Sequence, residues 1–179
     1  MDALRQRLKE TFAWVGDAGT SSTGADRSGW VRDPQVVAGI GQALAGLFPD
    51  ASPTIVFAPQ SSGYLYGPLV AQSTGAGFVG ASRKRPLADS DTWLVATTPL
   101  DYAGRNMELG FRASLMTGSD RVLVVDDWAD TGGQLLALKA LVERSGARYM
   151  GAAVIVDALT DHNVRRNIGL RSLLNRRDL

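Results

Sequence analysis

The sequence predicts an α/β fold in which a mainly parallel central sheet is flanked by helices. Short apolar segments rich in β-branched residues alternate along the chain with segments whose apolar residues recur at helical spacing. The strand segments are almost continuously apolar, which is typical of parallel strands that are covered on both faces. With 179 residues and 45% hydrophobic content, the chain has enough material for one domain with a sizeable core.

The first part of the chain combines a long polar segment with a clear helix start. A short amphipathic helix is expected at the N-terminus, followed by a long loop from Phe12 to Trp30 that is rich in Gly, Ser, Thr and Asp. Asp33 and Pro34 then have the roles of N-cap and first-turn residue of a helix. That helix is expected to continue to about Pro49, with one apolar face lined by Val36, Val37, Ile40, Leu44 and Leu47.

The rest of the chain alternates between strands and helices. The expected strands are 54–58, 77–81, 92–97, 121–126 and 149–159. The expected helices are 64–73 and 134–144, and Gly146 ends the second. Asp161 and His162 fall in a stretch that has the character of a turn, where no nucleophile accompanies the histidine.

The composition excludes several classes of function. Nineteen basic and eighteen acidic residues give a net charge of +1, so no nucleic-acid partner is expected. The chain has no cysteine and a single histidine, which leaves only hard, oxygen-bound cations as candidate metals. The opening segment is charged and no run of eighteen apolar residues occurs, so no membrane association and a cytoplasmic location are expected.

The segment VLVVDDWADTGGQ (122–134) carries the clearest chemistry. An apolar strand ends at Asp126 and Asp127, and the loop 129–133 opens the following helix. In sheets of this kind, ligands bind at the carboxyl edge of the strands. The backbone N–H groups of a glycine-containing loop and the positive end of the helix together form a cradle for phosphate, to which Thr131 adds a hydroxyl.

The paired carboxylates need a partner other than the phosphate, because like charges repel. A divalent cation or the vicinal hydroxyls of a sugar would serve, and a ribose phosphate would satisfy both the acids and the loop. The alternative is that Asp126 and Asp127 only cap the strand and turn while the glycines end it. The segment has neither the P-loop pattern nor the glycine order of a dinucleotide-binding fingerprint.

This segment resembles the phosphoribosyl pyrophosphate (PRPP) binding motif of type I phosphoribosyltransferases, and the chain as a whole is most similar to the adenine enzymes. SSGYLYGPLVAQSTGAGFVGASRKR (61–85), PLDYAG (99–104) and RSLL (171–174) resemble further segments of that family in the same order. The resemblance implies a Rossmann-like domain over 1–179, with a small hood at about 1–33 and a mobile lid loop at about 85–108.

The resemblance also implies roles for individual residues. Asp126 and Asp127 would contact the ribose hydroxyls and, through water, Mg²⁺, the one cofactor implied; no residue would bind the metal directly. The other PRPP-binding residues implied are Ala129, Asp130, Thr131, Gly132, Gly133 and Gln134 for the 5′-phosphate, and Ser61, Ser62, Gly63, Arg83 and Lys84 for pyrophosphate.

Four residues are implied in catalysis and one in binding the base. Asp101 and Tyr102 match lid residues that close over the reacting centre, and Lys84 lies beside the leaving group. Asp130 is the candidate for handling the proton of the base. Trp128 occupies the position of an apolar residue that walls the base, where an indole could stack on a heterocycle.

The chain departs from the family pattern at several positions. Ser62 stands where the pyrophosphate loop usually has arginine, and Gln60 where it has glutamate. Asp130 replaces the alanine of adenine enzymes and resembles the acid of hypoxanthine, guanine and xanthine enzymes. Gln134 replaces a threonine, and the proline- and glycine-containing hood motif of the adenine enzymes is not recognisable in 20–30.

The expected function is Mg²⁺-dependent transfer of 5-phosphoribose from PRPP to a purine or purine-like base, with release of pyrophosphate. The partners would be PRPP and a nucleobase, and a homodimer is expected because dimers are common in the family. The alternative is a catalytically weak PRPP- or nucleotide-binding regulatory protein of the same fold, which Ser62 and Gln60 favour. A nucleic-acid-binding regulator would need a basic extra domain.

Overall fold

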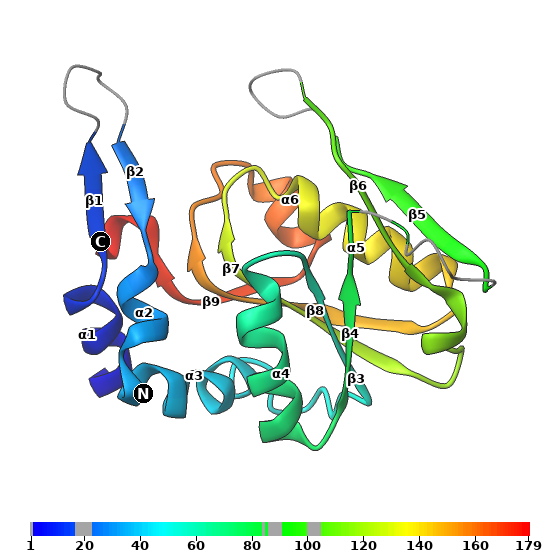
Figure 1. Ribbon diagram of the computed structural model, residues 1–179, viewed down its shortest axis with the longest axis horizontal. Helices are drawn as coiled ribbons and strands as arrows, with labels where there is room; N and C mark the ends of the chain where they lie inside the picture. Colours follow the sequence, from blue (N-terminus) through cyan, green and yellow to red (C-terminus); the bar gives the residue numbers. More distant parts are fainter. Residues whose placement is uncertain (1, 17–22, 84, 86–90, 100–104) are drawn as a thin grey trace.

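A five-stranded parallel sheet forms the centre of the protein (Figure 1). The computed structural model describes residues 2–16, 23–83, 85, 91–99 and 105–179. In sheet order the strands are β4 (Gly77–Ala81), β3 (Ile55–Pro59), β7 (Arg121–Ala129), β8 (Arg148–Asp157) and β9 (Leu170–Asn175). Every pairing between neighbours is parallel, so the predicted fold class is confirmed.

Helices cover both faces of this sheet. One hydrophobic core lies between the sheet and the helices α3 (Pro34–Ala45) and α4 (Gly63–Thr74). A second core lies on the opposite face, beneath α5 (Gly133–Arg144). At 12 residues each, these three helices are the longest in the described ranges and span about 18 Å, too short to cross a bilayer.

The start of α3 follows from the predicted cap. The side chain of Asp33 accepts hydrogen bonds from the backbone N–H groups of Gln35 (2.8 Å) and Val36 (3.1 Å). Burial alone would raise the pKa of Asp33, but these bonds and one from Arg7 hold it below its ordinary value. The predicted apolar face is too wide by one residue, since Val37 is 37% exposed.

The expectation of a loop over 12–30 is wrong for the described residues, because most of them form two strands and the start of a helix. After α1 (Asp2–Glu10), the strands β1 (Ala13–Gly16) and β2 (Thr23–Asp26) pair as an antiparallel hairpin, and α2 (Ser28–Arg32) follows. All four residues of β1 are exposed, so the strand has no alternation of apolar and polar residues to reveal it. The buried Trp30 anchors α2, and its indole Nε1 donates to the carbonyl of Leu8 (2.9 Å).

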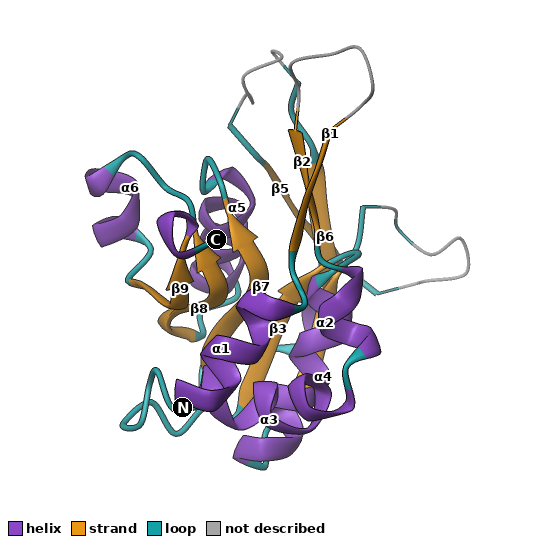
Figure 2. Cartoon of the chain, turned by 90° about the vertical axis from the view of Figure 1, so that its left-hand side faces the viewer, coloured by secondary structure: helices purple, strands orange, loops and turns teal. Residues whose placement is uncertain are grey.

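A second antiparallel hairpin packs against α5. The expected strand 92–97 is present as β5 (Trp93–Thr97), but it pairs with β6 (Glu108–Arg112) in a sheet of its own. Phe111 of β6 meets Phe57 of the central sheet with ring centroids 5.2 Å apart. In Figure 2 both hairpins rise on the side toward which the β7 and β8 arrows point. The predicted lid at about 85–108 therefore includes β5, and its role as a lid stays a prediction.

We expect Gly41→Ala to destabilise the protein and Gly39→Ala, two residues earlier on α3, to be neutral or stabilising. A Cβ atom at Gly41 would lie 2.3 Å from the carbonyl oxygen of Leu69 on α4, so the helices must separate, at about 1–3 kcal/mol. A Cβ at Gly39 would make only an ordinary 3.6 Å contact with Leu4, and alanine favours the helix. Thermal denaturation of both variants checks this; the opposite order of melting temperatures would contradict the close packing of α3 on α4.

Candidate active site

Two buried carboxylates lie within the C-terminal half of β7. Asp126 and Asp127 are each 4% exposed, and the strand continues beyond them to Ala129, three residues further than predicted. The backbone N–H of Asp127 donates to Oδ1 of Asp126 (2.9 Å). The acid pair is thus fixed by the sheet itself, at the edge where ligands of parallel sheets bind.

The surroundings of the pair disfavour two full negative charges. Burial and the charge of Asp127 raise the pKa of Asp126 well above its ordinary value. Burial, together with the nearby Asp127, likewise raises the pKa of Tyr66 on α4, so its phenol stays protonated. A ligand whose hydroxyl groups donate hydrogen bonds to the two carboxylates would lower the free-energy cost of burying their charge.

Two donors from distant parts of the chain hold Asp127. The guanidinium Nη1 of Arg27, between β2 and α2, lies 2.8 Å from Oδ2 of Asp127. The hydroxyl of Ser62 donates to Oδ1 of Asp127 (3.0 Å) and lies 3.5 Å from Oδ1 of Asp126. The sequence analysis did not identify Arg27 as a site residue. The feature that could have indicated it is that Arg27 is the one basic residue between Lys9 and Arg32.

The predicted anion cradle is the loop between β7 and α5, and its role in binding phosphate stays a prediction. Gly132 adopts a left-handed conformation (φ 77°) as the N-cap of α5, and a Cβ there would lie 2.7 Å from the side chain of Val164. The hydroxyl of Thr131 accepts from the backbone N–H of Gly133 (3.3 Å). A cavity of about 90 Å³ lies between this loop and Asp126; its lining residues are Asp126, Trp128, Ala129, Asp130, Thr131, Gly132, Gly133, Gln134 and Leu135.

The predicted pyrophosphate loop lies between β3 and α4. Ser61 and Ser62 lead into Gly63, the first residue of the helix, and the peptide bond between Gln60 and Ser61 is cis. The side-chain oxygen of Gln60 accepts from the hydroxyl of Ser82 (3.2 Å) and the backbone N–H of Arg83 (3.3 Å). Gln60 therefore ties this loop to the end of β4, where the predicted basic residues begin.

A larger cavity, of about 500 Å³, brings Arg83 together with the anion cradle. Thr131, Gly133 and Gln134 line it from the cradle side, and Arg105, Asn106 and Met107 line it from the segment that precedes β6. The exposed Asp130 lies outside the lining of this cavity but within that of the smaller one. Lys84, Asp101 and Tyr102 fall outside the described residues.

Trp128 connects the acid pair to the hood. Its ring lies nearly parallel to that of Phe12 (centroids 6.1 Å apart, 17°) and perpendicular to that of Trp14 (6.1 Å, 90°). The guanidinium carbon of Arg27 lies 5.9 Å from its ring centroid. Trp128 also lines the small cavity, and its predicted role as a wall for the base stays a prediction.

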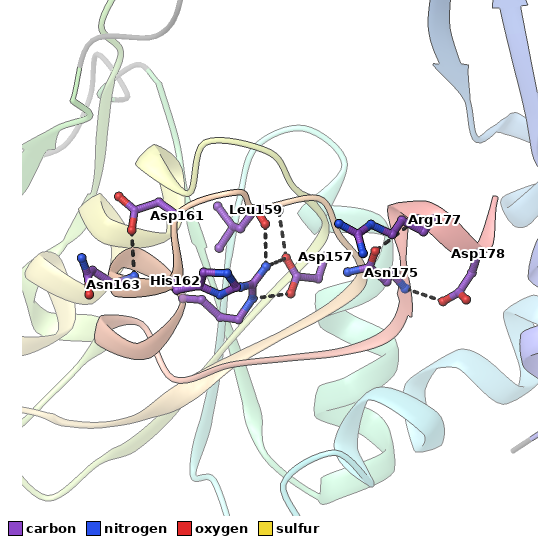
Figure 3. Close-up of polar contacts among 9 residues, drawn as sticks. Asp157, Leu159, Asp161, His162, Asn163, Asn175, Arg177 and Asp178 are labelled. Carbon is purple, nitrogen blue, oxygen red and sulfur yellow. Dashed lines mark hydrogen bonds and ion pairs between the residues drawn. The ribbon is translucent and has the colours of Figure 1, made fainter.

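A salt bridge supports the anion cradle from behind. Arg165 donates through Nε to Oδ2 of Asp157 (2.7 Å) and through Nη2 to the carbonyl of Leu159 (2.5 Å). Figure 3 shows Asp157 and Leu159 close to each other. The bridge fixes the segment between β8 and α6 (His162–Asn167). Leu159 of this segment and Val164 of α6 fill the space beside Gly132. The turn expected around His162 is in fact the start of α6, and His162 contacts Arg165 through Nδ1 (2.7 Å).

Comparison with known proteins identifies the family. The family described as phosphoribosyl transferase domain matches residues 31–173. The chain belongs to this family. The predicted recognition is confirmed, and the match includes the acid pair, the anion cradle and the Ser61–Gly63 loop.

Similar proteins carry adenine and xanthine in their names. The chain is 33% identical over 156 residues to the adenine phosphoribosyltransferase of Paracidovorax citrulli, covering 86% of this chain and 81% of that protein. It is 31% identical over 125 residues to the xanthine phosphoribosyltransferase of Lactobacillus delbrueckii subsp. bulgaricus, covering 70% of this chain and 66% of that protein. A crystal structure of the Trypanosoma brucei adenine phosphoribosyltransferase in complex with AMP, pyrophosphate and ribose 5-phosphate shares the fold, with a TM-score of 0.80 at 22% identity over 98% of this chain and 81% of that one.

We expect Asp126→Asn to raise the melting temperature at neutral pH in the absence of PRPP and Mg²⁺. The pKa of Asp126 is raised in the folded state, so this carboxyl favours folding below the ordinary aspartate pKa of about 4, and that contribution is lost as pH rises through the folded pKa. Asparagine never ionises and keeps the oxygen that accepts from Asp127. The gain should shrink as pH falls toward 4. A gain independent of pH in a thermal melt series would show that ionisation of Asp126 is not the cause.

Proposed function

We propose that the protein transfers 5-phosphoribose from PRPP to a purine or purine-like base, with release of pyrophosphate and dependence on Mg²⁺. The observation that carries the proposal is the cavity shared by the buried carboxylate Asp126 and the anion cradle at the start of α5. A ribose phosphate fits that combination, since its hydroxyls suit the acids and its phosphate suits the cradle. Family membership and the names of the relatives support the same reaction.

Binding would use both halves of the site at once. The ribose hydroxyls would donate to Asp126 and Asp127, whose buried carboxylates have little access to water. The 5′-phosphate would accept from the backbone N–H groups of the cradle and from Thr131, at the positive end of α5. These contacts would hold the sugar with its reacting carbon toward the Ser61–Gly63 loop.

The reaction would exchange one bond at the ribose C1 for another. The bond from C1 to the pyrophosphate oxygen breaks with its electron pair leaving on pyrophosphate, a ring nitrogen of the base bonds to C1, and the nitrogen loses its proton. Arg83 and the N–H groups of the Ser61–Gly63 loop would stabilise the departing anion. Asp130, at the small cavity, is the proposed proton acceptor.

The donor set fits Mg²⁺ bound through the substrate. Within the described ranges, no group of three or more His, Cys, Asp or Glu side chains is placed to hold a metal. The carboxylate oxygens of Asp126 and Asp127 would hold the ion through water, while the substrate supplies the direct oxygen ligands that Mg²⁺ prefers. Mg²⁺, when bound, would neutralise part of the charge that develops on pyrophosphate.

The proposal extends to the identity of the base, the oligomeric state of the protein and its location in the cell. Relatives named for adenine and for xanthine both match, and Asp130 and Trp128 at the small cavity are the residues proposed to separate these bases. Exposed apolar side chains on α3 and α4, Val37 and Leu65, are consistent with the expected homodimer. The cytoplasmic location stays a prediction. The alternative of a catalytically weak PRPP- or nucleotide-binding regulatory protein rests on Ser62 and Gln60, neither of which carries a charge.

Incubation with PRPP, Mg²⁺ and a panel of nucleobases tests the activity, with pyrophosphate release as the readout. We expect turnover with a purine, and substitution of Asp130 by alanine to change the ratio of kcat/KM values between adenine and xanthine. Absence of turnover with every base, combined with a higher melting temperature in PRPP, would support the regulatory protein instead.

We expect Asp127→Asn to weaken PRPP binding at least tenfold, since the carboxylate that would accept from a ribose hydroxyl loses its charge. The matched control is Asp50→Asn, which changes the net charge equally at an exposed position after α3. Titration calorimetry with Mg²⁺ present measures both. Equal PRPP affinity in the two variants would remove the acid pair from the proposed ribose site.

A further inference from the structure

We propose that Arg27 supplies the guanidinium that the pyrophosphate loop lacks at Ser62, and that it binds the pyrophosphate group of PRPP. The inference rests on the proposed function and names a further substrate-binding residue for it. Arg27 lies in the hood, 100 residues before the carboxylate that it contacts. The proposed role of Arg27 follows from the position of its guanidinium beside Asp127.

The first observation is the shared position of Arg27 and Ser62. The Ser62 hydroxyl donates to Oδ1 of Asp127 (3.0 Å), and Nη1 of Arg27 lies 2.8 Å from Oδ2 of the same carboxylate. The two side chains thus approach one small group from two different segments. A guanidinium on Arg27 therefore lies beside the place where a longer side chain at position 62 would reach.

The second observation is the balance of charge. The buried pair of Asp126 and Asp127 repels any anion that approaches the Ser61–Gly63 loop, and Ser62 contributes no positive charge against it. Arg27 is the ion-pair partner of Asp127 within the described ranges. A multiply charged pyrophosphate at the Ser61–Gly63 loop needs such a cation at close range. Arg83 lines the larger cavity, and the Ser61–Gly63 loop is not part of that lining.

The third observation is that Arg27 is held but accessible. Its side chain is 37% exposed, and its guanidinium carbon lies 5.9 Å from the ring centroid of Trp128. The guanidinium has five N–H donors in a planar fork, and its hydrogen bond to the described residues uses Nη1. The remaining donors suit the paired oxygens of a phosphate, which arginine binds in bidentate fashion.

These observations imply an exchange of partners when PRPP binds. The ribose hydroxyls take over the carboxylate of Asp127, while the guanidinium of Arg27 turns to the pyrophosphate oxygens. The hood then closes one side of the site through the substrate itself. The competing role is a purely structural clamp, in which Arg27 only fastens the hood to β7.

Titration calorimetry with Mg²⁺ separates these roles, using pyrophosphate, PRPP and ribose 5-phosphate as ligands. We expect Arg27→Ala to weaken pyrophosphate and PRPP at least tenfold and to change the affinity for ribose 5-phosphate less than threefold. Arg27→Lys should keep part of the affinity, because the charge remains and the fork is lost. The matched control is Arg32→Ala, an exposed arginine at the end of α2, which should leave all three affinities unchanged.

The decisive variant is Ser62→Arg in the Arg27→Ala background. We expect it to restore pyrophosphate affinity to within threefold of the unmodified protein, which a structural clamp could not do. Two results would overturn the role of Arg27 while leaving the proposed function in place. One is loss of affinity for all three ligands in Arg27→Ala with no rescue by Ser62→Arg, and the other is unchanged pyrophosphate affinity in Arg27→Ala. Failure of the unmodified protein to bind either PRPP or pyrophosphate would instead overturn the proposed function. Melting temperatures of each variant confirm that it is folded.

Discussion

Burial of two adjacent carboxylates within one strand is the constraint on which the rest of the site depends. Asp126 and Asp127 have little contact with water, so their charge must be met by protein donors, by a ligand or by a retained proton. The protein uses Arg27, Ser62 and a raised pKa at Asp126. Arg27 belongs to the hood and Ser62 to the β3–α4 loop, so these contacts hold both segments against the central sheet.

The loop that opens α5, which is the predicted anion cradle, would meet the opposite requirement, because its backbone N–H groups are hydrogen-bond donors. Gly132 takes a left-handed conformation that opens α5, and the backing side chains of Leu159 and Val164 leave no space for a Cβ. The bridge from Asp157 to Arg165 fixes that backing at the end of β8. Asp126 on β7 and the loop that opens α5 line one cavity. An acceptor beside backbone donors is the arrangement that the proposed phosphorylated sugar would require.

Much of this could be predicted from local sequence. The start of α3 depends on Asp33 and Pro34 alone, and β7 with its loop depends on a contiguous apolar run followed by acids and glycines. The comparisons confirm the family that this segment indicated. These features can be recognised in the sequence because the interactions that produce them involve residues only a few positions apart.

The hood and the contacts of Arg27 could not be predicted in this way. Every residue of β1 is exposed, so the strand exists through its pairing with β2 and through aromatic packing of Trp14 on Trp128. β6 and α6 are short and gain their order from Phe111 against Phe57 and from Arg165 against Asp157. Arg27 acquires its role only when the chain brings it to a carboxylate 100 residues away.

A crystal structure of the protein with PRPP and Mg²⁺ tests the central claim most directly. The account predicts density for the ribose with its vicinal hydroxyls within hydrogen-bonding distance of Asp126 and Asp127, and for the 5′-phosphate on the loop that opens α5. It also predicts that Arg27 has left Asp127 for the pyrophosphate. A ribose bound away from the acid pair, with Arg27 and Ser62 still holding Asp127, would contradict it.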